Sequence, residues 1–182
     1  AQTTVRQGSG GFFGGFMKGF CFVAGTEIAT PEGGKAIETF KAGDAVISLD
    51  AVNDVIEMHD MGEHETYMLA TEDCTVPTTA SEKVLTPEGL KVVESLVIGE
   101  PIMTVHGYQP VTQCEPTGKV EQVYELQCTG DNLFYANGIM AEGINEDELQ
   151  AIKGNSNEDA NNKSTKKTSK KGSKKNTEKV EE

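Results

Sequence analysis

Residues 21–48 read CFVAGTEIATPEGGKAIETFKAGDAVIS, and this stretch decides the fold. A cysteine opens a short β-prone run, and Pro31 to Gly34 has the composition of a turn. An apolar corner and a Gly-Asp pair then lead into a second β-prone run at Ala45 to Ile47. The stretch therefore predicts strands joined by tight turns, with Cys21 at their start.

The same pattern occurs a second time in the chain. Thr30-Pro31-Glu32-Gly33 returns as Thr86-Pro87-Glu88-Gly89, and each copy is followed by an apolar corner, a glycine next to an acidic residue, and a strand. The strands concerned are Val46-Ile47 in the first copy and Ile98 to Met103 in the second. Repetition of this kind predicts two halves with equivalent structure.

The rest of residues 20–145, where one core is expected, is also rich in β-prone runs. Polar turns, such as the one at residues 60–63, separate these runs and predict a meander. The expected strands include residues 55–58, 65–70, 83–86, 111–114 and 120–128. Asn137-Gly138, flanked by apolar residues 133–136 and 139–141, predicts a tight hairpin.

Both ends of the chain differ in composition from the middle. Residues 1–20 interleave glycine with phenylalanine, which predicts a flexible leader; its phenylalanines either dock on a partner or pack loosely on the domain. A short helix, capped by Asn145, is expected over residues 144–153. Residues 154–182 predict a disordered, Lys-rich tail, which leaves 21–143 as the domain.

Charge is distributed unevenly along the chain. The formal net charge is −13; residues 1–154 carry 8 Lys and Arg against 24 Asp and Glu (8 − 24 = −16), and residues 155–182 carry 8 Lys against 5 Asp and Glu (+3). An acidic domain repels nucleic acid and anionic membrane, so neither is expected as its partner. No apolar run reaches membrane-spanning length.

The spacing of cysteines and histidines favours neither a metal nor another cofactor. No CxxC pair is present, and no histidine stands at ligand spacing from a cysteine. A disulfide framework is one interpretation, and scattered reduced thiols of an intracellular or virion protein are the simpler one. The residues are Cys21, Cys74, Cys114, Cys128, His59, His64 and His106.

Together, the opening motif and a closing motif resemble the Hint domain, which inteins and the self-processing part of hedgehog proteins share. The closing motif is a Tyr-acid-Leu strand, here residues 124–126, then a turn, Phe134-Tyr135-Ala136-Asn137-Gly138 and a last apolar strand. The resemblance covers about residues 20–143 and implies an all-β fold with pseudo-two-fold internal duplication. It also implies that Cys21 attacks the peptide bond before it, so that the substrate is the chain's own N-terminal flank.

The resemblance places further groups around Cys21. The family's Thr-x-x-His motif falls on residues 79–82, which keeps Thr79 but puts Glu82 in the place of the histidine. An ionised carboxylate donates no proton, so Glu82 helps only if burial raises its pKa. Glu125 takes the place of the family's acid. The predicted catalytic residues are therefore Cys21, Thr79 and Glu125, with Glu82, Asn132 (in place of a histidine) and Asn145 as weaker candidates.

The closing segment lacks the groups for the second half of splicing. The resemblance implies a terminal His-Asn pair after Ala141, and those places hold Glu142 and Gly143. Asn145 is two residues further on, and Glu146 after it has no thiol or hydroxyl to accept an acyl group. Splicing competence is therefore expected to be lost.

Two interpretations of function stay open. In the first, a degenerate Hint domain acts mainly as a structural module between leader and tail, in an assembly of the phage-particle type. Cys21 is then a small buried hydrophobe. In the second, Cys21 makes an N-to-S acyl shift and the chain cleaves itself once at the Phe20–Cys21 bond.

Overall fold

The structure is a computed structural model that describes residues 20–151. The predictions of a flexible leader and of a Lys-rich tail fall almost entirely on residues 1–19 and 152–182, outside the described residues. The chain divides into two units, residues 1–145 and residues 146–182. In the second unit, residues 146–151 are helical, and the last two residues of the expected 144–153 helix lie outside the described range.

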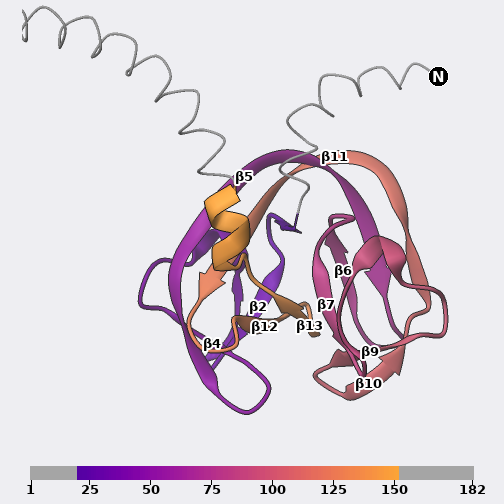
Figure 1. Cartoon of the computed structure of the whole chain (residues 1–182), viewed down its shortest axis with the longest axis horizontal. Coiled ribbons are helices and arrows are strands. Elements are labelled where there is room, and N and C mark those ends of the chain that lie inside the picture. Colours follow the sequence, from indigo (N-terminus) through magenta and orange to yellow (C-terminus); the bar gives the residue numbers. More distant parts are fainter. Residues whose placement is uncertain (1–19, 152–182) are drawn as a thin grey trace, which may run out of the picture. The chain divides into compact units, whose positions relative to one another are not determined.

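Within residues 20–145 the structure is almost entirely strands, joined by tight turns and two short 3-10 helices (Figure 1). This confirms the all-β prediction. The elements are β1 Phe22–Val23, β2 Glu27–Thr30, β3 Gly33–Ala36, η1 Ile37–Thr39, β4 Ala45–Ile47, β5 Val52–Ala70, β6 Thr75–Thr78, β7 Lys83–Thr86, β8 Gly89–Val92, η2 Val93–Ser95, β9 Pro101–Thr104, β10 Gly107–Pro110, β11 Gln113–Cys128, β12 Leu133–Ala136 and β13 Ile139–Glu142.

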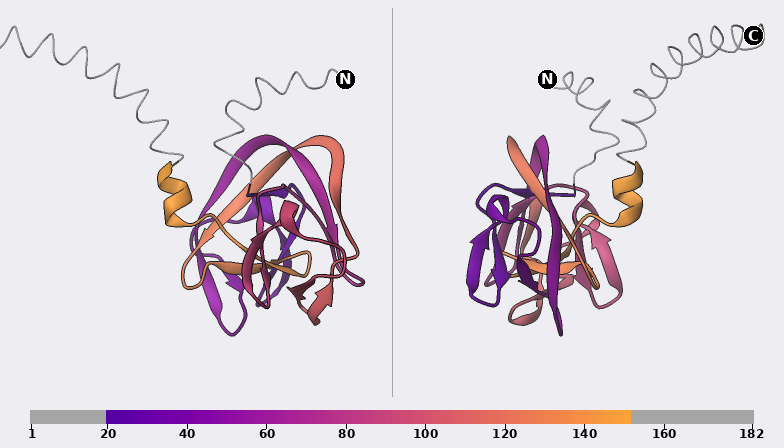
Figure 2. Two further views of the ribbon diagram at one scale, coloured as in Figure 1. Left: turned by 45° about the vertical axis from the view of Figure 1, so that its right-hand side comes forward. Right: turned by 90° about the vertical axis from the view of Figure 1, so that its left-hand side faces the viewer.

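These strands form two sheets. One has the order β11-β1-β6-β5-β4, and the other has the order β10-β9-β13-β12-β2-β3, with β7 paired to β13 and β8. The long strands β5 and β11 also pair with each other along most of their length and arch over the body of the unit (Figures 1 and 2). Short β1 lies between β6 and β11, which places the start of the domain inside the first sheet.

The predicted duplication is present at a constant offset of 56 residues. Thr30 Oγ1 donates to the Gly33 carbonyl at 2.6 Å, and Thr86 Oγ1 donates to the Gly89 carbonyl at 2.8 Å (86 − 30 = 56). The 3-10 helices begin at Ile37 and at residue 93, again 56 apart. Each repeat therefore folds into the same hairpin, corner and strand, because it carries the same turn residues and the same apolar pattern.

The same offset locates the pseudo-two-fold axis. In the β5–β11 ladder, Glu65 pairs with Val120 and His64 pairs with Glu121. Adding 56 to 64 and 65 gives 120 and 121, so these two pairs exchange with each other under the symmetry. The axis consequently passes between the two long strands at this point, and each half of the duplication contributes one of them.

The predicted meander is wrong for residues 55–70, which belong to the one long strand β5; residues 113–128 likewise form one strand, β11. Gly62, in a segment whose composition predicts a turn, has φ +83° and lies opposite Val123, where the ladder shifts register. Gly118, with φ +80°, lies within a second shift between Pro116 and Val120. A bulge absorbs an extra residue and bends the strand without ending it, so turn-forming residues mark bulges here.

The Asn137-Gly138 hairpin is confirmed. Asn137 has φ +48° and Gly138 has φ +89°, and β12 pairs with β13 on either side of them. Two consecutive positive φ values are what the two-residue turn between twisted strands requires. The hairpin lies in the middle of the second sheet, next to β2 and β9.

Apolar side chains from both halves form one core. Phe22 of β1 meets Phe134 of β12 edge to face, with ring centroids 6.0 Å apart. Fully buried residues at equivalent places in the two repeats pack around them, namely Ile28, Ile37 and Val46 in the first and Val84, Val93 and Ile102 in the second. Because β1 contributes to this core, the residue before it is also drawn inside.

Both ends of the domain meet the same part of β11. At the start, Phe22 pairs with Tyr124. At the end, the Ile144 N–H donates to the Leu126 carbonyl at 2.9 Å. Residues at the start and at the end of the domain therefore bond to positions of β11, Tyr124 and Leu126, that are two residues apart.

Candidate functional site

Strand register fixes the surroundings of Cys21. Phe22 pairs with Tyr124 on β11 and with Thr78 on β6, and both pairings are antiparallel. Continuing each ladder by one residue places Cys21 beside Glu125 on one side and beside Thr79 on the other. Residues far apart in the sequence are therefore brought together by a strand of only two residues.

Two threonines hold the backbone of Cys21. Its N–H donates to Thr79 Oγ1 at 3.0 Å, and Thr78 Oγ1 donates to its carbonyl at 2.6 Å. Thr79 Oγ1 also lies 3.5 Å from that carbonyl. Cys21 is completely buried, at 0% exposure. The peptide nitrogen that would become the leaving amine therefore has a defined orientation, with the Thr79 hydroxyl next to it.

Sequence reasoning missed Thr78. Two consecutive threonines on a strand normally point to opposite faces, and only Thr79 matched the family motif. Both reach Cys21 here because β6 ends at Thr78, so that Thr79 already belongs to the following turn. The adjacent pair of hydroxyls was the signal available in the sequence.

A pair of buried carboxyl groups completes the site. Glu82 and Glu125 are both at 0% exposure, and Glu82 is the ionisable group that acts most strongly on Glu125. Glu82 reaches this place through a turn in which its N–H donates to the Thr79 carbonyl at 3.2 Å. The same turn therefore presents Thr79 to Cys21 and Glu82 to Glu125.

This pair holds a proton where an exposed glutamate would not. Burial is the largest cause that raises the pKa of Glu125 well above its usual range, followed by the neighbouring Glu82 carboxyl group and the charge of Cys21. Only the Leu126 N–H, which donates to Glu125 Oε1 at 3.0 Å, favours the ionised form. Two carboxylates buried side by side repel each other, so a proton on one of them is favoured and the pair is a local store of acid.

Asn132 and Asn145 occupy different surroundings. Asn132, with φ +61°, accepts from the Cys128 N–H at 2.8 Å and donates to the Ile144 carbonyl at 3.0 Å. Its side chain thus ties the end of β11 to the segment after β13. Asn145 follows Ile144 and precedes the helical residues 146–151. The structure accordingly brings together Cys21, Thr79, Glu82 and Glu125.

The other three cysteines lie in environments that disfavour a thiolate. All four cysteines are free thiols. Burial raises the pKa of Cys74 and of Cys114, and it raises the pKa of Cys128 to about 12. A thiol attacks as its thiolate, so these three remain poor nucleophiles at neutral pH.

No metal centre is apparent around these groups. Over residues 20–151, no three His, Cys, Asp or Glu side chains gather in a way that would hold a metal ion. In the same range, no helix is long and apolar enough to cross a membrane.

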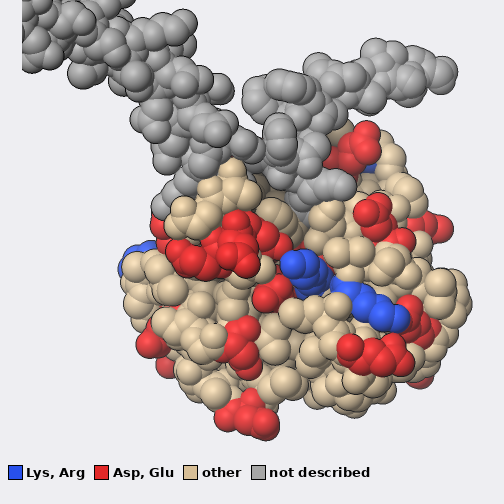
Figure 3. Space-filling view, viewed as in Figure 1, with Lys and Arg blue, Asp and Glu red and all other residues tan. Residues whose placement is uncertain are grey.

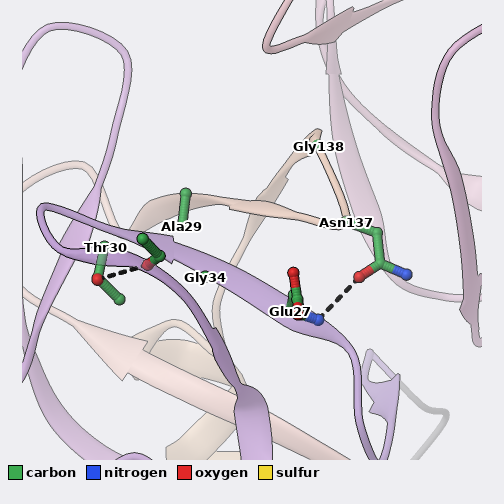
Figure 4. Close-up of a pocket in the computed structure, with 7 residues that line it drawn as sticks. Glu27, Ala29, Thr30, Gly34, Asn137 and Gly138 are labelled. Atoms are coloured by element: carbon green, nitrogen blue, oxygen red, sulfur yellow. Dashed lines mark hydrogen bonds between the residues drawn. The ribbon is translucent and has the colours of Figure 1, made fainter.

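A hollow of about 450 Å³ lies at another place, between the β2–β3 hairpin and the Asn137-Gly138 turn (Figure 4). Some of its polar groups hydrogen-bond within the fold, since the Glu27 N–H donates to Asn137 Oδ1 at 2.8 Å and Thr30 Oγ1 donates to the Gly33 carbonyl. None of the residues that line it belongs to the group around Cys21.

The visible surface carries many acidic groups (Figure 3). Residues 20–151 contain 24 Asp and Glu against 5 Lys and no Arg, a formal charge of 5 − 24 = −19. Exclusion of nucleic acid from the folded domain remains a prediction from this charge.

Comparison with known proteins agrees with the fold and the opening motif. The sequence profile of the Hint domain matches residues 20–79. The structure resembles the crystal structure of a substituted variant of the gp41-1 intein, with a TM-score of 0.64, 22% identity, and coverage of 68% of this chain and 98% of that one.

Two further solved structures are similar. The crystal structure of a DnaB intein from Synechocystis sp. PCC 6803 gives a TM-score of 0.63 and 22% identity, covering 68% of this chain and 97% of that one. The solution structure of a bacterial intein-like domain from Clostridium thermocellum gives 0.58 and 25%, covering 67% and 97%. Among proteins with curated descriptions, none matches significantly.

Residues 20–145 have the Hint fold of these inteins, and the first part of this range, residues 20–79, matches the Hint profile. The opening motif supplies Cys21 and the first hairpin, and the whole body of the neighbouring inteins is represented, since more than nine-tenths of each of these chains is covered. Within this Hint domain, the four residues gathered at the start of β1 include the three that the family resemblance predicts as catalytic. Glu82 joins them as the partner of Glu125.

Proposed function

We propose that this Hint domain cleaves its own chain once, at the Phe20–Cys21 bond, and does not complete splicing. The observation that carries the proposal is the position of Cys21, which is buried between Thr79 and Glu125 with its N–H on the Thr79 hydroxyl at 3.0 Å. A thiol held next to the preceding carbonyl attacks it as an intramolecular nucleophile, and intramolecular attack needs no encounter with a second molecule.

The step balances without a cofactor. Cys21 Sγ forms a bond to the carbonyl carbon of Phe20 while the bond from that carbon to the Cys21 nitrogen breaks. The thiol proton leaves sulfur, and the amide nitrogen gains a proton to become an amine. Water or an added thiol then attacks the thioester, releases residues 1–20 and regenerates the Cys21 thiol.

Geometry at the other end of the domain supports the loss of splicing. The family places its terminal asparagine where Gly143 stands. A Cβ on Gly143 would lie 2.3 Å from the Leu126 carbonyl oxygen and 2.7 Å from Asn132 Oδ1. An asparagine side chain therefore does not fit at this position in the present fold.

Incubation of the purified full chain with dithiothreitol tests the proposal by intact mass. We expect residues 1–20 to be released over days from the wild type and not from Cys21→Ala. Cys114→Ala serves as the matched control, since it removes a half-buried thiol away from the site. An intact mass that stays unchanged over time in the wild type, as in Cys21→Ala, would refute cleavage.

A second function is favoured by the complete burial of Cys21, which shields the thiol from solvent. In this alternative the Hint domain is a rigid β-body between leader and tail within a larger assembly of the phage-particle type. It predicts an unchanged mass in the same experiment, and the two functions are thereby separated.

A further inference from the structure

We propose that Glu82 and Glu125 act together as a proton exchanger for Cys21: the carboxylate of the pair takes the thiol proton, and its carboxylic acid partner gives a proton to the leaving nitrogen. The inference rests on the cleavage proposed above and names the groups that perform its proton transfers. It concerns this chain in particular, because Glu82 stands where the family has an imidazole.

The burial of the two carboxyl groups next to each other indicates that they share one proton. Both side chains are at 0% exposure and the charge of Glu82 acts directly on Glu125, so the pair is most stable with one proton and one negative charge between two carboxyl groups. Two buried charges side by side would be strongly unfavourable. Such a singly protonated pair contains an acid and a base at the same place.

The positions of Glu125 and Glu82 in the fold place both carboxyl groups near Cys21. Glu125 lies beside Cys21 in the extended β1–β11 register, and the charge of Cys21 acts on Glu125 directly. Glu82 arrives through the turn that begins at Thr79, whose hydroxyl contacts the Cys21 nitrogen. Glu125 is therefore next to Cys21 in the sheet, and Glu82 ends the turn that begins at the threonine contacting the leaving nitrogen.

The proton balance then closes within the pair. The carboxylate accepts the proton of the Cys21 thiol as sulfur attacks, and the acid donates its proton to nitrogen as the C–N bond breaks. Afterwards the pair again holds one proton and one negative charge. The exchanger returns to its starting state without any contribution from solvent.

Of the described groups, Glu82 and Cys21 are the ionisable ones that act on Glu125. His59 lies opposite Glu125 in the β5–β11 ladder, but its ring pairs with Gln127 Oε1 at 3.2 Å and lies 3.9 Å from Glu57. His59 is the one alternative proton carrier in this ladder position, and the test includes it.

Cleavage by an exchanger has a characteristic pH dependence. At low pH both carboxyl groups are protonated and no base remains, whereas at high pH both are ionised and no acid remains. The rate of thioester formation should therefore rise and then fall with pH. Simple thiolate attack would instead rise steadily as pH increases.

The test uses the full chain with dithiothreitol over a range from mildly acidic to mildly alkaline pH, followed by intact mass. Glu82→Gln and Glu125→Gln keep the shape of the side chain but cannot exchange a proton, and each should slow cleavage by about 10²–10⁴-fold. Glu115→Gln, an exposed residue on the same strand β11, is the control for charge, and His59→Gln is the control for an imidazole. Both controls should cleave at the wild-type rate.

The outcomes separate the two proposals. Cleavage by the wild type together with undiminished cleavage by either buried variant would overturn the exchanger and leave the function intact. Loss of cleavage on His59→Gln alone would do the same. No cleavage by the wild type would refute both. If a buried variant fails to fold, the wild-type pH profile decides, because a steady rise with pH contradicts the exchanger.

Discussion

At the scale of single residues, the Thr79 hydroxyl has an unusual position, since it meets the amide nitrogen and the carbonyl of the same cysteine. It accepts the Cys21 N–H at 3.0 Å and lies 3.5 Å from the Cys21 oxygen. It contacts the backbone of the proposed nucleophile, so we assign it a positioning role. Its contribution should appear in the rate of cleavage as well as in stability.

Thr79→Val removes the acceptor while keeping the volume of the side chain. A buried N–H left without a partner costs about 1–3 kcal/mol, so we expect a loss of stability of that size in urea unfolding. We also expect cleavage to slow by about tenfold, since misplacing the amine raises the barrier. Thr79→Ser keeps the hydroxyl and should retain most of both properties; equal losses in the two variants would contradict this role.

Glu125 links stability to pH. Its pKa is raised in the folded state, mainly by burial and then by Glu82, so the native chain binds more protons than the unfolded chain. The stabilisation is complete below the ordinary glutamate pKa and decreases as pH rises toward the raised pKa of the folded state. The wild type should therefore lose unfolding free energy across this interval.

Glu125→Gln should remove that loss. Glutamine mimics the protonated carboxyl, so the variant should have a larger free energy of unfolding than the wild type at mildly alkaline pH. Denaturant unfolding at several pH values measures this difference, with Glu115→Gln as the exposed control. Parallel pH curves for all three proteins would refute the linkage.

The chemistry of these residues could be predicted only in part. The family resemblance selected Cys21, Thr79 and Glu125, and the β1 register joins them. Glu82 ranked low because an isolated glutamate is ionised at neutral pH, and only the fold reveals that it is buried against a second carboxyl group. The side chain of Asn132 hydrogen-bonds to Cys128 and to Ile144, and these contacts likewise depend on the tertiary structure.

At the scale of elements, the segment that leaves β13 passes unusually close to β11. Gly143 has no side chain, and a Cβ added there would lie 2.3 Å from the Leu126 carbonyl oxygen. The neighbouring Gly143 and Ile144 N–H groups donate to Asn132 and Leu126. This closure therefore requires glycine for space.

Gly143→Ala should destabilise the domain by about 1–3 kcal/mol or more, because a backbone carbonyl must move to admit the methyl group. Gly34→Ala is the matched control: its added Cβ would meet the end of the flexible Glu27 side chain, which can turn away. Chemical unfolding of both variants measures the contrast. Equal midpoints would show that the closure is looser than the structure indicates.

Turn chemistry also explains why the element boundaries were only partly predictable. Asn137-Gly138 and the two Pro-Glu-Gly turns fold as their sequences indicate. Gly62 and Gly118 have the same kind of backbone conformation, yet the partner strand continues across them. Whether a glycine ends a strand or bends it is decided by that partner, which lies far away in the sequence.

At the scale of the whole molecule, the two halves of the duplication share the same backbone structure but carry different side chains at equivalent places. The offset of 56 residues relates Thr26, whose carbonyl accepts the Ile37 N–H, to Glu82, whose carbonyl accepts the Val93 N–H. Equivalent backbones thus carry a threonine in one half and a catalytic candidate in the other. The fold tolerates different residues at this corner, because the backbone hydrogen bond stabilises it in both halves.

A fusion with reporter domains at both ends should give no ligated product. Gly143 stands where the family has its terminal asparagine, and the space around it is too crowded for that side chain. Glu146 has no thiol or hydroxyl that could accept an acyl group. Gel analysis of the fusion detects the joined reporters, and Cys21→Ala in the same fusion reports cleavage at the first junction separately. A ligated product would mean that Asn145 is used as the terminal asparagine.

Entry and exit at neighbouring residues of β11 have a mechanical consequence. Tension applied to the flanking segments reaches β11 through the Phe22–Tyr124 pairing at one end and the Ile144–Leu126 hydrogen bond at the other. The load path therefore crosses only a few bonds and bypasses most of both sheets. Pulled from its ends, the domain should yield first at this junction, beside Cys21, while the two repeats are still folded.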